Sequence, residues 1–129
     1  MGLRRAMSSR HSPRIFISYR RGDSKWQAGR LYDSLQARLP EAALFMDVEA
    51  ISGGMDFEQA VNTAVSSSDV LLVVIGPDWI GATDAAGRRR LHDERDLVRI
   101  EIESGLRDDL LVVPVLLDDA PPPSADQLP

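Results

Sequence analysis

The fold is decided by the stretch Asp69-Val70-Leu71-Leu72-Val73-Val74-Ile75, in which apolar residues follow one another without a break. A short, uninterrupted run rich in β-branched residues is typical of a strand that is covered on both faces, as strands of parallel sheets are. Gly76-Pro77 follows immediately and ends the run with a turn. The stretch therefore predicts a buried strand of a parallel sheet.

The segments on either side alternate between strand-like and helix-like patterns. Short apolar runs predict three more strands, over Arg14–Ser18, Ala43–Met46 and Leu110–Leu117. Apolar residues at helical spacing predict three helices, over Lys25–Leu39, after a cap at Asp56, and over a segment that opens near Asp93 and includes Asp96–Leu106. This alternation is typical of an α/β domain whose parallel strands are joined by right-handed crossovers.

The composition narrows the class of protein. A chain of 129 residues, 43% hydrophobic and 27% charged, is ordinary for one globular domain. A net charge of −5 disfavours nucleic acid as the main partner. The chain has no cysteine and two histidines, so no metal site is expected. No apolar run approaches the roughly 18 residues of a membrane helix, and we expect a cytoplasmic domain that binds no membrane.

Polar residues follow the predicted strands at one edge of the sheet. Ligands of parallel α/β sheets bind at the carboxyl ends of the strands, near the point where the strand order switches. The loops Ser18–Ser24 and Gly76–Trp79 meet there if the first and third strands are neighbours. Asp47, which could bond a ribose or merely cap a loop, and the flexible loop Ser52-Gly53-Gly54 stand at the same edge.

The other candidate binding residues at this edge each have a structural alternative. Arg20 and Arg21 could hold a phosphate or pyrophosphate through paired hydrogen bonds, or could form a surface salt bridge. Tyr19, Phe57 and Trp79 could stack on a base, or could pack in the core, which suits Phe57 better. Chemistry alone leaves these alternatives open.

The predicted helix over Asp96–Leu106 carries two glutamates in different settings. At about 100° per residue, Glu101 falls in the apolar half of the circumference, while Glu103 falls on the polar side. A carboxylate on an inward face must find a partner, ionise with difficulty or line a cavity. An ion pair with an arginine is the commoner outcome and would make Glu101 structural. Ile100 is the one apolar residue outside the apolar half, which contains Leu97, Val98, Ile102, Gly105 and Leu106.

Several stretches together resemble a bacterial Toll/interleukin receptor (TIR) domain. They are Phe16-Ile17-Ser18-Tyr19-Arg20-Arg21, Phe45-Met46-Asp47-Val48, Asp69–Trp79 and Val98-Arg99-Ile100-Glu101-Ile102-Glu103, in that order. The resemblance implies a flavodoxin-like parallel sheet of order 2-1-3-4-5 with helices on both faces. It also implies a domain over residues 14–119. Residues 1–13 are polar and contain arginines, so we expect a disordered leader there rather than a binding arm. The proline-rich residues 120–129 would begin a linker or a missing C-terminal part that holds the last strand and helix.

The resemblance also implies an activity. Many members of the family cleave NAD⁺ at the nicotinamide–ribose bond, and their catalytic glutamate lies where Glu101 lies here. Bond breaking creates an oxocarbenium-like centre, which Glu101 would stabilise or attack. NAD⁺ is then a substrate and no cofactor is expected. Arg20 or Arg21 would hold the pyrophosphate, and Trp79 or Phe57 would flank a ring.

Assembly is the other property that the resemblance implies. Family members assemble through the loop at Val48–Met55, so we expect homo-oligomers with other TIR domains and a fused or associated sensor or effector domain. The expected setting is bacterial defence, against phage for example, or signalling. The alternative is a scaffold without enzymatic activity that only recruits other TIR domains. Two positions depart from the family pattern: Leu97 stands where an aromatic residue is common, and Ser52-Gly53-Gly54 lacks the usual proline.

Overall fold

The structure is a computed structural model that describes residues 12–46, 57–83, 85–93, 96–118, 120 and 122–123, and for Arg21, Phe57, Glu58, Ala60 and Leu97 it describes the backbone alone. Strands and helices alternate along it. The order is β1 (Arg14–Ser18), α2 (Arg21–Arg38), β2 (Ala43–Phe45), α4 (Phe57–Ser66), β3 (Val70–Ile75), the short 3₁₀ helix η1 (Arg90–His92), α5 (Leu97–Arg107) and β4 (Leu111–Leu116).

The four strands form one parallel sheet in the order β2-β1-β3-β4. The register pairs Phe16 of β1 with Phe45 of β2 and with Leu71 of β3, and it pairs Leu71 with Val112 of β4. β1 and β3 are therefore neighbours, as the predicted ligand edge requires. The predicted order 2-1-3-4-5 is confirmed for its first four strands.

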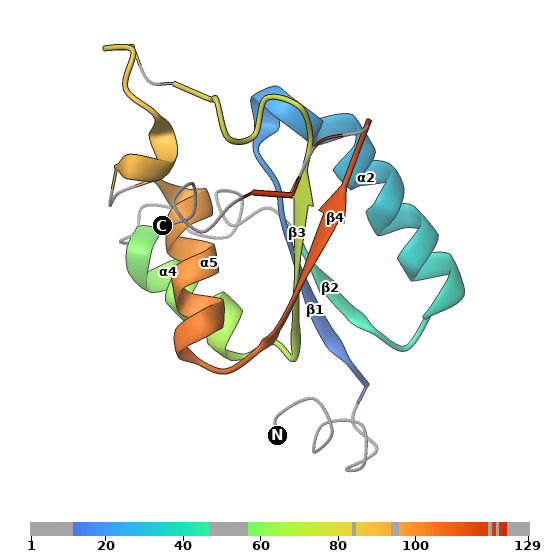
Figure 1. Ribbon diagram of the computed structural model, residues 1–129. Coiled ribbons are helices and arrows are strands. Elements are labelled where there is room, and N and C mark those ends of the chain that lie inside the picture. The colour runs from blue at the N-terminus through green and yellow to red at the C-terminus, as the bar shows by residue number, and fades with distance from the viewer. Residues whose placement is uncertain are drawn as a thin grey trace.

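Helices cover both faces of the sheet, α2 on one side and α4 with α5 on the other (Figure 1). The pleat of the strands divides the core between these two layers, because successive side chains point to opposite faces. Ile15 and Ile17 of β1 pack on the α2 side with Val74 of β3. Phe16 and Leu71 pack on the other side, against α4 and α5.

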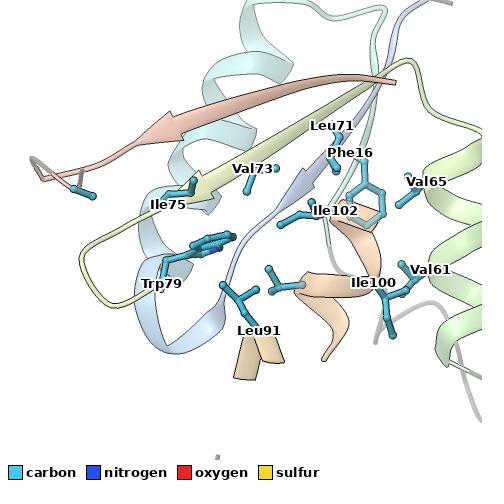
Figure 2. Packing of buried hydrophobic residues seen from close by; sticks show 12 residues of the cluster. Phe16, Val61, Val65, Leu71, Val73, Ile75, Trp79, Leu91, Ile100 and Ile102 are labelled. Carbon is cyan, nitrogen blue, oxygen red and sulfur yellow. The ribbon is translucent and has the colours of Figure 1, made fainter. Parts of the chain in front are cut away.

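The larger part of the core lies between the sheet and α4 with α5 (Figure 2). Val61 and Val65 of α4 are fully buried there. Ile100 and Ile102 of α5 are buried in the same cluster. None of the helices that the described residues form is both long and apolar enough to cross a membrane.

Three details differ from the sequence predictions. α2 begins at Arg21 rather than at Lys25, and a residue with non-helical backbone angles, Ser24, joins its first turn to the rest. α5 opens after its cap Asp96, whereas the sequence predicts the start of this helix at Asp93 or a neighbour. The buried face of α5 is also shifted, because Ile100 is 7% exposed while Leu106 is 61% exposed. The reason is that α5 packs against both the sheet and α4, so its buried arc includes a residue that a one-sided helix would expose.

Candidate functional site

Arg20 lies just beyond the last residue of β1, and its side chain forms a buried ion pair. Its Nη1 and Nη2 donate to Oδ1 and Oδ2 of Asp96, each over 2.9 Å. The two side chains are only 3% and 2% exposed. A parallel pair of charge-assisted hydrogen bonds of this kind fixes both the distance and the direction of the partners. Arg20 thus forms a salt bridge that is buried rather than on the surface, and its predicted hold on a phosphate or pyrophosphate stays a prediction.

Asp96 has a second task at the start of α5. Its Oδ2 accepts a hydrogen bond from the backbone N–H of Arg99 over 3.2 Å, which is the bond of a helix N-cap. A second cation stands nearby, since Nε of Arg90 lies 3.5 Å from Oδ1 of Asp96 and the Arg90 side chain is 48% exposed. The Asp96 carboxylate thus connects Arg20 after β1, Arg90 of η1 and the first turn of α5.

The loops that follow β1 and β3 are joined by a different carboxylate. Asp23, in the first turn of α2, accepts from the backbone N–H of Gly76 through Oδ2 and from that of Asp78 through Oδ1, each over 2.8 Å. The prediction that these two loops meet is therefore confirmed. These two hydrogen bonds satisfy the Asp23 carboxylate. They also attach the turn after β3 to the first turn of α2.

A cleft of about 260 Å³ opens at this carboxyl edge. Charged side chains from three segments line it, among them Arg20, Asp23, Asp78 and Arg90. Pockets that enclose a drug-sized ligand have volumes of about 300–1,000 Å³. The described part of this cleft is therefore smaller than a pocket that encloses a whole drug-sized ligand.

Glu101 is buried on α5, and Glu103 is not. Glu101 is 7% exposed, whereas the Glu103 side chain is 46% exposed and accepts from Nε of Arg99 over 3.1 Å. The helical-face argument is confirmed for both residues. Glu101 has polar interactions of its own, and its Oε1 is a buried oxygen that accepts no hydrogen bond from a described residue. Glu101 is not one of the described residues that line the cleft at Arg20.

The remaining predicted site residues are placed as follows. Trp79 is fully buried in the cluster that contains Ile75 and Leu91, and Figure 2 shows its ring between them. Tyr19 is half-buried and packs against the α2 side of the core. The backbones of Arg21 and Phe57 belong to α2 and α4, and their side chains lie outside the description. Asp47, Ser52, Gly53 and Gly54 also lie outside the described residues.

The arrangement of the site can be compared with known proteins. Residues 15–128 match the model of one protein family, whose description is TIR domain. The chain belongs to the TIR domain family. The match covers nearly the whole sequence, so the predicted TIR family is confirmed.

A solved structure supports the fold of this TIR domain. It is the activated Roq1 resistosome directly recognizing the pathogen effector XopQ, in its TIR domains, with a TM-score of 0.59 and 22% sequence identity. The match covers 83% of this chain and 58% of that one. This TIR domain therefore spans less than two thirds of that chain, and at this identity the likeness establishes the shared fold. No curated protein sequence matches at a significant level.

Sequence reasoning missed three polar residues of the TIR domain's carboxyl edge. The sequence predicts a loop at Asp23 and a helix at Asp96 and gives neither residue a role in the site, and it does not point to Arg90. Asp96 stands directly before the apolar-periodic segment of α5, which is a recognisable signal for an N-cap. No local signal shows that its partner is Arg20, because the two residues are 76 positions apart in the chain. Within the described residues, no three histidine or acidic side chains form a group that could hold a metal ion.

Proposed function

We propose that this TIR domain cleaves NAD⁺ at the bond between nicotinamide and ribose, with Glu101 as the residue that faces the reacting carbon. The observation that carries the proposal is the burial of Glu101, at 7% exposure, on a helix whose adjacent residues Ile100 and Ile102 are buried too. Burying a carboxylate is costly, and a site that must stabilise positive charge gives such a residue a use. The resemblance of the α5 segment to the family's catalytic helix supports the same assignment.

The chemistry needs one carboxylate and no metal. The bond between the nicotinamide nitrogen and the ribose breaks with its electron pair on nitrogen, so nicotinamide leaves as a neutral molecule and needs no acid. The ribose carbon becomes an oxocarbenium-like cation, as in glycoside cleavage. The Glu101 carboxylate stabilises that charge, or adds to the carbon before water replaces it. A low-dielectric setting strengthens this electrostatic effect. Addition of water gives ADP-ribose, whereas attack by a group of the same molecule gives a cyclic isomer.

We further propose that the site is complete only in an assembly. The cleft at Arg20 would hold one portion of NAD⁺, and Glu101 is not among the described residues that line this cleft. The loop at Ser52, Gly53 and Gly54 of a neighbouring copy would supply the missing wall. A domain of this kind responds to assembly by a sensor or effector partner, in a defence or signalling role such as protection of a bacterium from phage.

The test is release of nicotinamide from NAD⁺ by the full chain, measured over a concentration series that spans the monomer and the assembled state. The variant Glu101→Gln keeps the size of the side chain and removes its charge, and it should lower the rate at least about 100-fold. Glu103→Gln is the matched control, since it makes the same change two residues away on the exposed side. Equal rates for Glu101→Gln and the parent would refute the assignment.

A scaffold without enzymatic activity is the second candidate. This candidate is favoured by the position of Glu101, which is not one of the described residues that line the cleft. In that case Glu101 is a structural residue, and NAD⁺ stays constant even when the protein is fully assembled. Glu101→Gln would then lower the melting temperature and leave self-association unchanged. Measuring NAD⁺ and oligomeric state in the same samples separates the two candidates.

A further inference from the structure

α5, the helix that carries Glu101, is held at both of its halves by polar contacts to other elements. In the second half, Oδ1 of Asn62 on α4 accepts from Oγ of Ser104 and from Nη2 of Arg107, the latter over 3.1 Å. Gly105 in the same half fits closely against the sheet, because a Cβ there would lie 2.7 Å from Cδ2 of Leu71. These contacts fix the end of α5 that is far from its N-cap.

The first half of α5 depends on Asp96. The carboxylate caps the helix through the Arg99 N–H, and its bidentate bond with Arg20 joins the helix to the end of β1. Both partners are at most 3% exposed, so salt and water do not weaken the bond as they do at a surface. Arg99 adds a weaker link, donating from Nη1 to the Leu91 carbonyl over 3.3 Å.

Glu101 stands between these two attachments. At a rise of about 1.5 Å per residue it lies roughly 7.5 Å along the helix from Asp96. With the second half held by Asn62 and Leu71, the bond between Arg20 and Asp96 decides the tilt of the first half. That tilt decides where the Glu101 carboxylate stands relative to the carboxyl edge of the sheet.

We propose that Asp96 is a positioning residue, which sets the place of Glu101 through its bidentate bond with Arg20. The proposal rests on the proposed function for its consequence in catalysis. It also changes the predicted role of Arg20: this residue acts through Asp96 on the reacting group rather than as the binder of a pyrophosphate. A shift of about 1 Å in a catalytic group lowers a rate by about 100-fold, so a small change of tilt is sufficient.

Three variants of the full chain test the proposal. Asp96→Asn keeps an oxygen for the N-cap and removes the charge. The double variant Arg20→Met with Asp96→Asn also removes the buried cation, so that the fold is retained without the ion pair. Asn62→Ala is the matched control, since it breaks the polar attachment of the other half of α5. We measure kcat and KM for nicotinamide release, melting temperature, and hydrogen exchange of the α5 amides.

Asp96→Asn should lower kcat about 100-fold and leave KM within about twofold, and the double variant should keep the same loss of kcat. Asn62→Ala should lower the melting temperature and change kcat by less than about threefold. Recovery of kcat in the double variant together with its melting temperature would overturn the proposal, because Asp96 would then only stabilise the fold. A raised KM at unchanged kcat would also overturn it and would assign Arg20 to substrate binding.

Hydrogen exchange decides the matter even if the parent protein releases no nicotinamide, an outcome that would refute the proposed function alone. Asp96→Asn should speed exchange at residues 100–103 at least tenfold and leave residues 105–107 unchanged, as expected for local opening of one end of a helix, at about 1.4 kcal/mol per tenfold change. Asn62→Ala should instead speed exchange at residues 105–107 and leave residues 100–103 unchanged. Uniform acceleration along α5 in Asp96→Asn would overturn the positioning role, whatever the activity.

Discussion

Asp23 and Gly76 approach each other so closely that a Cβ on Gly76 would lie 2.6 Å from Oδ1 of Asp23. The contact exists because the Asp23 carboxylate accepts from the backbone N–H groups of Gly76 and Asp78, each over 2.8 Å. A residue in the first turn of α2 thereby closes the turn after β3. The glycine is required here by the short distance and not by an unusual backbone angle.

Gly76→Ala should therefore destabilise the protein. The added methyl group must push the Asp23 carboxylate away, which weakens two hydrogen bonds to a charged acceptor and lowers the free energy of unfolding by about 1–3 kcal/mol. Gly29→Ala is the matched control, because Gly29 lies within α2 and a Cβ there meets no atom within 4 Å. That change should raise stability by about 0.5–1 kcal/mol. Urea unfolding measures both, and equal effects of the two substitutions would contradict the account of Gly76.

Loss of the buried ion pair between Arg20 and Asp96 should lower the free energy of unfolding far more than loss of a partly exposed ion pair on α5. Asp96→Ala leaves the Arg20 guanidinium buried without its bidentate partner and should lower the free energy of unfolding by about 3–5 kcal/mol. Glu103→Ala removes the pair with Arg99, which is partly exposed and spaced i, i+4, and should lower it by about 0.3–0.5 kcal/mol.

The dependence of these stability losses on salt concentration also distinguishes the buried ion pair from the partly exposed one. High ionic strength screens exposed charges and acts much less on buried ones. The effect of Glu103→Ala should therefore shrink between low and high salt, while that of Asp96→Ala should stay nearly constant. If high salt abolished the loss of stability caused by Asp96→Ala, the ion pair would be solvated. That result would contradict the 3% exposed fraction of the Arg20 side chain.

The two tryptophans of the chain should differ in their access to solvent. Trp79 is fully buried and Trp26 is 78% exposed. In the variant Trp26→Phe, the remaining fluorescence comes from Trp79 and should resist quenching by acrylamide, whereas Trp79→Phe should leave a readily quenched signal from Trp26.

Addition of NAD⁺ to Trp26→Phe tests the predicted ring contact at the same time. The ring of Trp79 is enclosed by core residues such as Ile75 and Leu91, so the emission of Trp79 should not change when nucleotide binds. A strong change on binding would show that Trp79 leaves the core to stack on the substrate, as the sequence hypothesis holds.

Local patterns in the sequence were sufficient for the architecture of this TIR domain. The run from Val70 to Ile75 became β3, and the alternation around it became a sheet whose first four strands have the predicted order. These features are readable because an unbroken apolar run and a helical repeat are properties of neighbouring residues. The same repeat placed Glu101 inward and Glu103 outward on α5.

Contacts between distant segments were decided only by the tertiary structure. The pairing of Arg20 with Asp96 and that of Asp23 with Gly76 join residues 76 and 53 positions apart, and no spacing rule relates them. Ile100 is buried against the α4 layer because α5 lies between two partners, a fact that its own periodicity does not contain. The sequence by itself determined only some of the residues that could line the carboxyl edge, those of the loops Ser18–Ser24 and Gly76–Trp79. The packing of the helices on the sheet decided which of them meet there, because burial forces each charge to take the partner that the fold brings to it.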